Sequence, residues 1–196
     1  MRKTEDISFD FSDLNDKSGK NIKKNIWHFI YEWLESFVFA IILILLVFVF
    51  VVRVVGVNGE SMLPTLNHGD WLTISSINPT IDRGDIVVIT QPNTLNEPLI
   101  KRVIAVGGDT LKINFVTGEV FVNGEVIEEP YIYAPTARPG DFKEPIKIPE
   151  GYVFVMGDNR NNSLDSRFDT IGIIDERYIL GVANARVYPF GEWEIY

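Results

Sequence analysis

The longest uninterrupted apolar run lies near the N-terminus, where "FVFAIILILLVFVFVV" from Phe37 to Val52 contains no charge, glycine or proline. Extending it to Ser36–Val57 admits only one charged residue, Arg53. At about 1.5 Å per residue, this longer segment crosses a hydrocarbon core of roughly 30 Å. It is apolar on all sides, whereas a core helix of a soluble protein keeps a polar face. The pattern predicts a transmembrane helix, with the stem of Arg53 reaching the headgroups near its outer end.

The flanks of this run predict its orientation. Basic and aromatic residues gather on its N-terminal side, namely Lys17, Lys20, Lys23, Lys24, Trp27, Tyr31 and Trp33. Lysines beside a membrane span favour the cytoplasmic side, and aromatic rings favour the interface. A cleavable signal peptide has a shorter apolar centre, about 7 to 15 residues, followed by an A-x-A site; here "VGVNGESM" follows. We therefore expect a cytoplasmic tail over 1–25, an uncleaved single-pass anchor over 26–57, and an extracytoplasmic domain over 58–196.

Beyond Val57 the pattern changes to short β-branched and aromatic runs separated by Gly, Pro, Asn and Asp, which is typical of an all-β domain. Asn123-Gly124 between alternating residues predicts a tight hairpin. The proline-rich stretch Pro130–Pro149 predicts a surface loop. The strand candidates are "RGDIVVIT", "LIKRVIA", "TLKINFV", "EVFVNGEVI", "GYVFVMGD" and "GVANARVYPF".

Composition excludes several classes of partner and of active site. A length of 196 residues allows one domain of ordinary size or two small lobes. The formal charge of -9 argues against a nucleic-acid partner, which needs a basic face. The absence of cysteine excludes a disulfide framework, a thiolate nucleophile and a cysteine zinc site. Only two histidines are present, His28 and His68.

The strand candidate "LIKRVIAVGGD" carries two adjacent cations, one on each face because side chains alternate along a strand. Both charged heads could reach water on long apolar stems. A buried lysine, however, is held neutral more easily, and documented cases have a pKa of about 5 to 6. Arginine keeps its proton in proteins, so only Lys101, and not Arg102, is a candidate base.

A candidate nucleophile stands in "NGESMLPTLNHGD", where Ser61 follows a glycine and precedes a proline turn. A serine hydroxyl needs a base to become nucleophilic. His68 lies in the turn "NHGD", where a surface histidine is expected, and the G-x-S-x-G elbow is absent. These observations disfavour a serine-histidine-aspartate triad.

The third stretch, "GYVFVMGDNRNNSLDSRFDTIG", is a strand that continues into a dense polar loop. An EF-hand starting at Asp158 would need an oxygen ligand third and glycine sixth, but Arg160 and Ser163 stand there. No metal site is therefore predicted. Asp165 and Arg167 can pair instead, which suggests structural support for a neighbouring site.

These three stretches together resemble the type I signal peptidases, membrane-anchored serine proteases that remove signal peptides from exported proteins. The resemblance covers most of the chain from Ser36 onward. The family pattern S-M-x-P-T-L stands as Ser61–Leu66, and K-R-V-I as Lys101–Ile104, followed by Gly108-Asp109. The pattern M-G-D-N-R-D-N-S-x-D-S-R stands as Met156–Arg167 with one change.

The resemblance implies a serine endopeptidase without a cofactor, in which Ser61 is the nucleophile and Lys101 the general base. Ser163 would orient the ammonium by a hydrogen bond, and the Ser61 N–H would contribute to the oxyanion hole. Among the supporting residues, Asp165 and Arg167 would pair and Asp158 would fix the loop. The family fold implies two antiparallel β lobes, the second inserted at about 112–150.

The resemblance also implies substrates and partners: exported preproteins cut after small residues of the A-x-A kind, the lipid bilayer, and the secretion machinery as a candidate. The apolar pockets would be lined by Val57, Met62, Leu66, Leu99 and Ile100. Two positions depart from the family pattern: Gly59 replaces a serine that in many members completes the oxyanion hole, and Asn161 replaces an aspartate. The alternative from another class is a non-catalytic anchored β domain, against which an intact Ser61 and Lys101 count.

Overall fold

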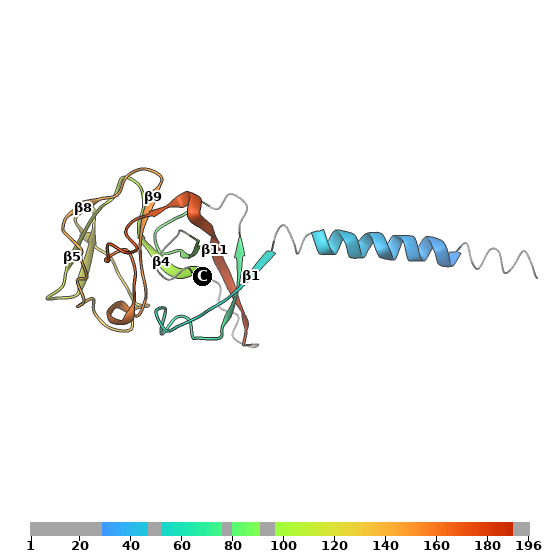
Figure 1. Ribbon diagram of the computed structural model, residues 1–196, viewed down its shortest axis with the longest axis horizontal. Helices are drawn as coiled ribbons and strands as arrows, with labels where there is room; N and C mark the ends of the chain where they lie inside the picture. Colours follow the sequence, from blue (N-terminus) through green and yellow to red (C-terminus); the bar gives the residue numbers. More distant parts are fainter. Residues whose placement is uncertain (1–28, 47–51, 76–79, 91–96, 190–196) are drawn as a thin grey trace, which may run out of the picture. The chain divides into compact units, whose positions relative to one another are not determined.

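The computed structural model describes residues 29–46, 52–75, 80–90 and 97–189. The chain divides into two units, Met1–Phe48 and Val49–Tyr196. In the first unit the described part is one α-helix, drawn in blue in Figure 1. The second unit is built from antiparallel strands, which agrees with the all-β prediction.

The larger sheet has seven strands in the order β1-β2-β11-β3-β4-β9-β10. Every pairing in it is antiparallel, and β11 carries register shifts against both of its neighbours. β4 lies between β3 and β9, so both of its edges are hydrogen-bonded and all of its residues are buried. The strands span β1 Val52–Gly56, β2 Trp71–Ser75, β3 Ile86–Ile89, β4 Leu99–Ala105, β9 Tyr152–Met156, β10 Ile174–Asp175 and β11 Ile179–Tyr188.

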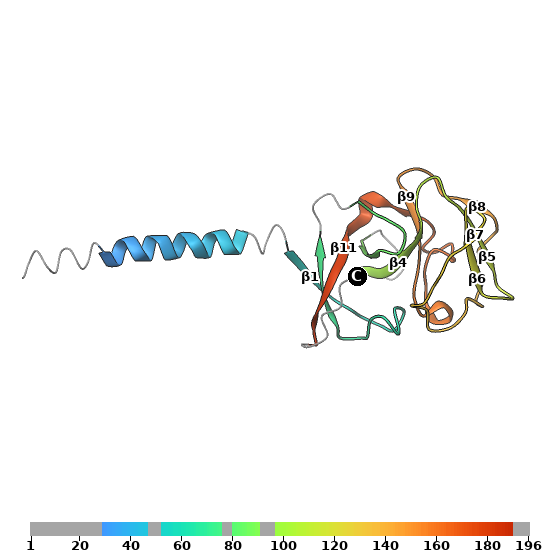
Figure 2. The same cartoon turned by 180° about the vertical axis from the view of Figure 1, so that it is seen from behind.

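The smaller sheet has four strands in the order β7-β6-β5-β8, and Figure 2 shows them side by side at one end of the β unit. In the chain they all lie between β4 and β9. The predicted hairpin is confirmed, because Asn123 and Gly124 join β6 to β7 with φ of 55° and 88°. Such a two-residue turn needs positive φ at both positions. The strands are β5 Thr110–Asn114, β6 Glu119–Val122, β7 Glu125–Val126 and β8 Ile146–Lys147.

One apolar cluster joins the two sheets. Ile104 from β4 and Phe154 from β9 pack in the same cluster as Leu111, Ile113 and Val120 of the smaller sheet. Since each sheet alone exposes one apolar face, this shared cluster buries both faces at once. It also fixes the smaller sheet against β4, which carries Lys101, and against β9, which leads into the polar loop from Asp158 to Arg167.

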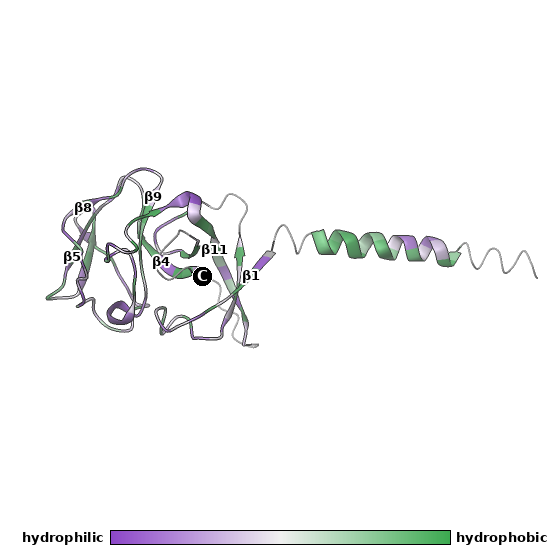
Figure 3. Ribbon diagram, in the orientation of Figure 1, coloured by the Kyte–Doolittle hydropathy of each residue, from purple (hydrophilic) through white to green (hydrophobic). Residues whose placement is uncertain are grey.

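The N-terminal helix, Phe29–Leu46, is long and apolar enough to cross a membrane. Its 18 residues span about 27 Å at 1.5 Å per residue. Figure 3 shows it as hydrophobic over most of its length, and its apolar side chains are exposed, Tyr31 and Trp33 among them. The predicted basic residues Lys17, Lys20, Lys23 and Lys24, and the aromatic Trp27, lie outside the described residues.

The predicted continuation of this helix to Val57 is wrong. Val52–Gly56 forms strand β1, in which Arg53 is exposed and stands opposite Ile74 of β2. Four valines flank the arginine on its two sides, and β-branched residues favour a strand when a partner strand is present. Arg53 therefore belongs to the β unit and not to the end of a membrane helix.

Candidate active site

Ser61 and Lys101 meet in the structure. Lys101 stands in the middle of β4, and its Nζ donates hydrogen bonds to Ser61 Oγ at 2.7 Å and to the carbonyl oxygen of Ile100 at 3.0 Å. The lysine is only 3% exposed, so its head does not reach water along the stem. The snorkelling alternative is therefore excluded for Lys101.

Burial makes it easier for this lysine to lose its proton. Desolvation lowers the pKa of Lys101 from 10.5 to about 8, while the negative charges of Asp165 and Asp158 act in the opposite direction. A substantial share of Lys101 is then neutral in mildly alkaline solution. Neutral Nζ can accept the proton of the serine hydroxyl that lies within hydrogen-bond distance.

The turn that carries Ser61 is held from two sides. Inside the turn, Leu63 N–H donates to the carbonyl oxygen of Glu60 at 3.2 Å. From the loop after β9, Asn159 N–H donates to the carbonyl oxygen of Ser61 at 3.0 Å. A Cβ at Gly157 would come within 2.4 Å of that same Ser61 oxygen, so only glycine allows this approach.

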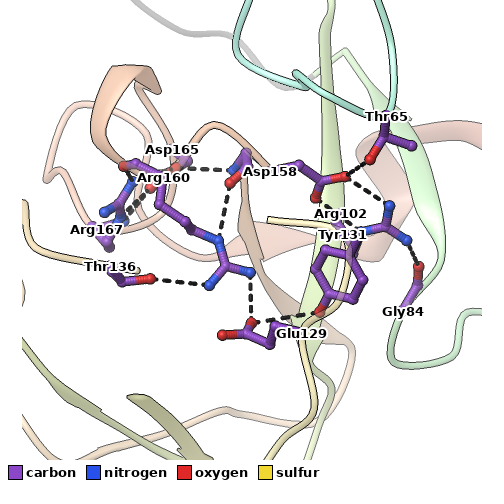
Figure 4. Close-up of polar contacts among 11 residues, drawn as sticks. Thr65, Gly84, Arg102, Glu129, Tyr131, Thr136, Asp158, Arg160, Asp165 and Arg167 are labelled. Atoms are coloured by element: carbon purple, nitrogen blue, oxygen red, sulfur yellow. Dashed lines mark hydrogen bonds and ion pairs between the residues drawn. The ribbon is translucent and has the colours of Figure 1, made fainter. Parts of the chain in front are cut away.

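Arg102 lies beside Lys101 in sequence but takes part in a separate network, drawn in Figure 4. Its Nε and Nη2 donate to the two oxygens of Asp158 at 2.9 and 2.7 Å, and its Nη1 donates to Gly84 O at 2.7 Å. The guanidinium carbon lies over the ring of Tyr131, 3.9 Å from the ring centroid. Asp158 also accepts from Thr65 Oγ1 at 2.5 Å, which ties the serine turn to the loop after β9.

Asp165 and Arg167 form a fully buried ion pair, with Nε and Oδ1 2.9 Å apart. The other carboxylate oxygen, Oδ2, accepts from the backbone N–H of Gly157 at 3.0 Å. Arg167 Nη1 donates to Arg138 O at 2.8 Å. The pair thus braces the backbone at Gly157, directly behind Ser61.

Sequence reasoning missed the role of Arg160, which it used only to reject an EF-hand. This side chain is fully buried, and its Nη2 lies 2.6 Å from Glu129 Oε1. Its Nη1 donates to Thr136 Oγ1 at 3.1 Å and its Nε to Gly157 O at 3.1 Å. The network therefore connects residues 129–136 to the loop after β9 (Figure 4). One arginine in a polar loop gives no sequence signal of this, because Thr136 and Glu129 lie 24 and 31 positions away.

Ser163 does not make the expected hydrogen bond to Lys101. Its Oγ is buried and has no hydrogen-bond partner in the described part of the chain. It lies close to Gly157, where an added Cβ would meet Ser163 Oγ at 2.4 Å. In this structure Lys101 Nζ is oriented by Ser61 and the Ile100 carbonyl instead.

The two departures from the family pattern have structural explanations. Gly59 has a φ of +97°, a conformation that favours glycine, and its N–H donates to His68 Nδ1 at 3.2 Å. The amide of Asn161 donates to Pro135 O at 3.0 Å and accepts from the N–H groups of Ala137 and Arg138. An aspartate there could accept but could not donate.

A groove of about 490 Å³ opens beside the serine and the lysine. Four of the five predicted pocket residues line it: Val57, Met62, Leu99 and Ile100. Leu66, the fifth, is not among the lining residues: its N–H donates to Met62 O, and its side chain is fully buried in the core. Sequence reasoning missed several other lining residues, including Asn58, Glu97, Pro98, Asn162 and Leu164.

The described residues contain no group of three or more His, Asp or Glu side chains that could hold a metal ion. The ionisable residues that line the groove are Glu60, Glu97 and Lys101.

Comparison with known proteins decides the family. The model of the signal peptidase family, peptidase S26, matches residues 30–188. The chain belongs to this family. Signal peptidase I S of Bacillus subtilis (strain 168) is 35% identical over 175 residues, covering 83% of this chain and 91% of that protein. A probable signal peptidase I-1 of Synechocystis is 36% identical, covering 85% and 87%.

Among solved structures, the crystal structure of a signal peptidase I from Enterococcus faecalis V583 aligns with a TM-score of 0.42 and 25% identity. The alignment covers 53% of this chain and 97% of that one.

Proposed function

We propose that this signal peptidase is a membrane-anchored Ser/Lys endopeptidase that removes signal peptides from exported preproteins. The observation that carries the proposal is the 2.7 Å contact between Lys101 Nζ and Ser61 Oγ beside an apolar groove. Membership of the signal peptidase family supports the same reaction.

In the proposed mechanism, neutral Lys101 accepts the hydroxyl proton while Ser61 Oγ bonds to the scissile carbonyl carbon. The tetrahedral intermediate collapses as the C–N bond breaks, and the Lys101 ammonium gives its proton to the leaving amine. Ser61 is then esterified by the signal peptide. Water attacks this ester with Lys101 again as base, which releases the signal peptide and restores the serine hydroxyl.

The developing oxyanion needs hydrogen-bond donors fixed in advance. We assign one donor to the backbone N–H of Ser61. Residue 59 supplies no side-chain donor, because it is a glycine. The buried pairs Asp165–Arg167 and Arg102–Asp158 serve as supports that hold Gly157 and the serine turn in register.

The groove suggests the substrate. Val57, Met62, Leu99 and Ile100 give it apolar walls of modest size, which fit the small side chains of an A-x-A site. The N-terminal helix would anchor the enzyme with residues 58–196 outside and the N-terminus in the cytoplasm. A preprotein whose apolar segment is still in the same bilayer then meets the groove at a raised effective concentration.

Cleavage of a labelled preprotein by the detergent-solubilised full chain tests the proposal. We expect one new N-terminus after an A-x-A sequence, found by N-terminal sequencing, and no product with Ser61→Ala. Cleavage by the Ser61→Ala protein would overturn the proposed nucleophile. Binding of the preprotein without cleavage by the wild-type chain would favour a non-catalytic β domain.

A further inference from the structure

Asn159 stands at the N-cap position of the short helix η1, Arg160–Asn162, yet its side chain makes no capping hydrogen bond. Asparagine at such a position normally accepts from the helix N–H groups. Here its Nδ2 instead donates to the carbonyl oxygen of Glu60 at 3.1 Å, ninety-nine positions away in sequence. The side chain is therefore committed to the serine turn and not to its own helix.

The Glu60 carbonyl belongs to the peptide unit whose N–H is that of Ser61. This carbonyl oxygen accepts two hydrogen bonds, one from Asn159 Nδ2 and one from Leu63 N–H at 3.2 Å. In a trans peptide the C=O and N–H bonds point in opposite directions. Fixing the Glu60 oxygen therefore also fixes the direction of the Ser61 N–H.

The Ser61 N–H itself has no protein acceptor within the ranges that the structure describes. Ser61 lines the groove, so a donor that is free in this way is available to a substrate carbonyl. Donation to the carbonyl end of an amide polarises it and strengthens the N–H as a donor. A second bond, from Asn159 N–H to Ser61 O, holds the following peptide unit.

We infer that Asn159 is a positioning residue for the oxyanion hole: its side-chain amide aims and polarises the Ser61 N–H toward the scissile carbonyl oxygen. The inference rests on the proposed function, in which Ser61 is the nucleophile. Asn159 touches neither the nucleophilic oxygen nor Lys101 in any recorded hydrogen bond. It acts only through the Glu60–Ser61 peptide.

The first test is the kinetics of Asn159→Ala in the detergent-solubilised full chain. We expect kcat for preprotein cleavage to fall about 10- to 100-fold, somewhat less than the loss of a whole oxyanion donor. KM should stay within about two-fold and the midpoint of the pH profile should not move, because Lys101 is untouched. Asn161→Ala is the matched control: its amide binds residues 135–138 and not the serine turn, so kcat should be retained.

A pair of peptide inhibitors distinguishes loss of oxyanion-hole positioning from general damage to the fold of the variant. A peptide aldehyde adds Ser61 Oγ to its carbonyl carbon and places its oxygen in the oxyanion hole, whereas the matching peptide alcohol cannot. Asn159→Ala should weaken the aldehyde by the same factor as kcat/KM and leave the alcohol unchanged. This ratio does not depend on how much of the variant is folded.

Wild-type kcat in Asn159→Ala, or equal weakening of the aldehyde and the alcohol, would overturn the inference. Full cleavage by Ser61→Ala would instead overturn the proposed function itself. The two failures are therefore distinguishable.

Discussion

Lys101 and Arg102 are neighbouring buried cations on opposite faces of β4, and their polar surroundings differ. Arg102 is matched by both oxygens of Asp158, a backbone carbonyl and an aromatic ring. Lys101 is buried more completely, yet no carboxylate in the described part of the chain pairs with it directly. Its hydrogen-bond partners are a serine hydroxyl and one carbonyl.

The difference shows how one strand can hold a structural cation, Arg102, next to a candidate base, Lys101. A buried charge with a matched partner stays charged and holds its surroundings in place. A buried amine without one gives up its proton more easily. The Asp158 and Asp165 charges that would oppose this are each paired with an arginine. We propose that the arginines thereby help to keep Lys101 neutral.

Replacing Lys101 should have the largest effect on activity. In Lys101→Met the general base is lost, and preprotein cleavage should fall by about 10²- to 10⁴-fold or more. The melting temperature of the full chain in detergent should be unchanged or higher, because an unpaired buried amine is removed. Lys101→Arg should be equally inactive, since a guanidinium keeps its proton. Cleavage at the wild-type rate by the arginine variant would show that proton transfer by this residue is not needed.

Replacing Arg102 should have the opposite effect on stability. Arg102→Met leaves Asp158 buried without its partner, which costs about 3–5 kcal/mol. Thermal unfolding of the full chain in detergent should show a clear fall in melting temperature, in contrast to Lys101→Met. If both variants shift the melting temperature in the same direction, the contrast between the two faces is wrong.

The pH dependence of cleavage tests the difference between Lys101 and Arg102 in a second way. The pKa of Lys101 is lowered to about 8, so kcat/KM should rise with pH through about 8 as the amine loses its proton. In Arg102→Lys, which pairs less completely with Asp158, more of the carboxylate's field reaches Lys101 and the midpoint should move to higher pH. A profile that is flat between mildly acidic and alkaline pH would count against a lysine base.

The smallest effect is expected at Asn161, whose amide contacts residues 135–138. Asn161→Asp removes one donor to Pro135 O in an exposed position, which costs about 0.5–1.5 kcal/mol. Cleavage should stay close to that of the wild-type chain, as shown by initial rates on the same preprotein. A large loss of activity would mean that residues 135–138 do more than support the loop.

Ser61 and Lys101 could be selected from the sequence as a candidate nucleophile and a candidate base, because that choice depends on residue chemistry. An apolar strand with one lysine, a serine before a proline turn and no useful histidine leave few alternatives. The strand class and the Asn123-Gly124 hairpin follow from local alternation and turn geometry. The end of the helix was predicted wrongly, because valines around Arg53 fit a helix or a strand, and only pairing with β2 decides between them.

The rest of the site depends on contacts between distant segments. Leu66 is buried by strands β2, β3 and β4, and Arg160 is buried against residues 129–136. The buried Ser163 hydroxyl makes no hydrogen bond to Lys101 in the described part of the chain. The use of the Asn159 amide likewise requires Glu60 to lie beside it. No local pattern encodes such contacts, so the sequence indicated the residue types but not their partners.

The proposed mechanism requires a large share of Lys101 to be neutral near pH 8, and direct titration of its amine tests this. In the full chain labelled with ¹³Cε-lysine, the NMR resonance missing from Lys101→Met identifies the residue. We expect this resonance to titrate with a midpoint near 8. A midpoint near the ordinary lysine value of 10.5 would contradict this expectation.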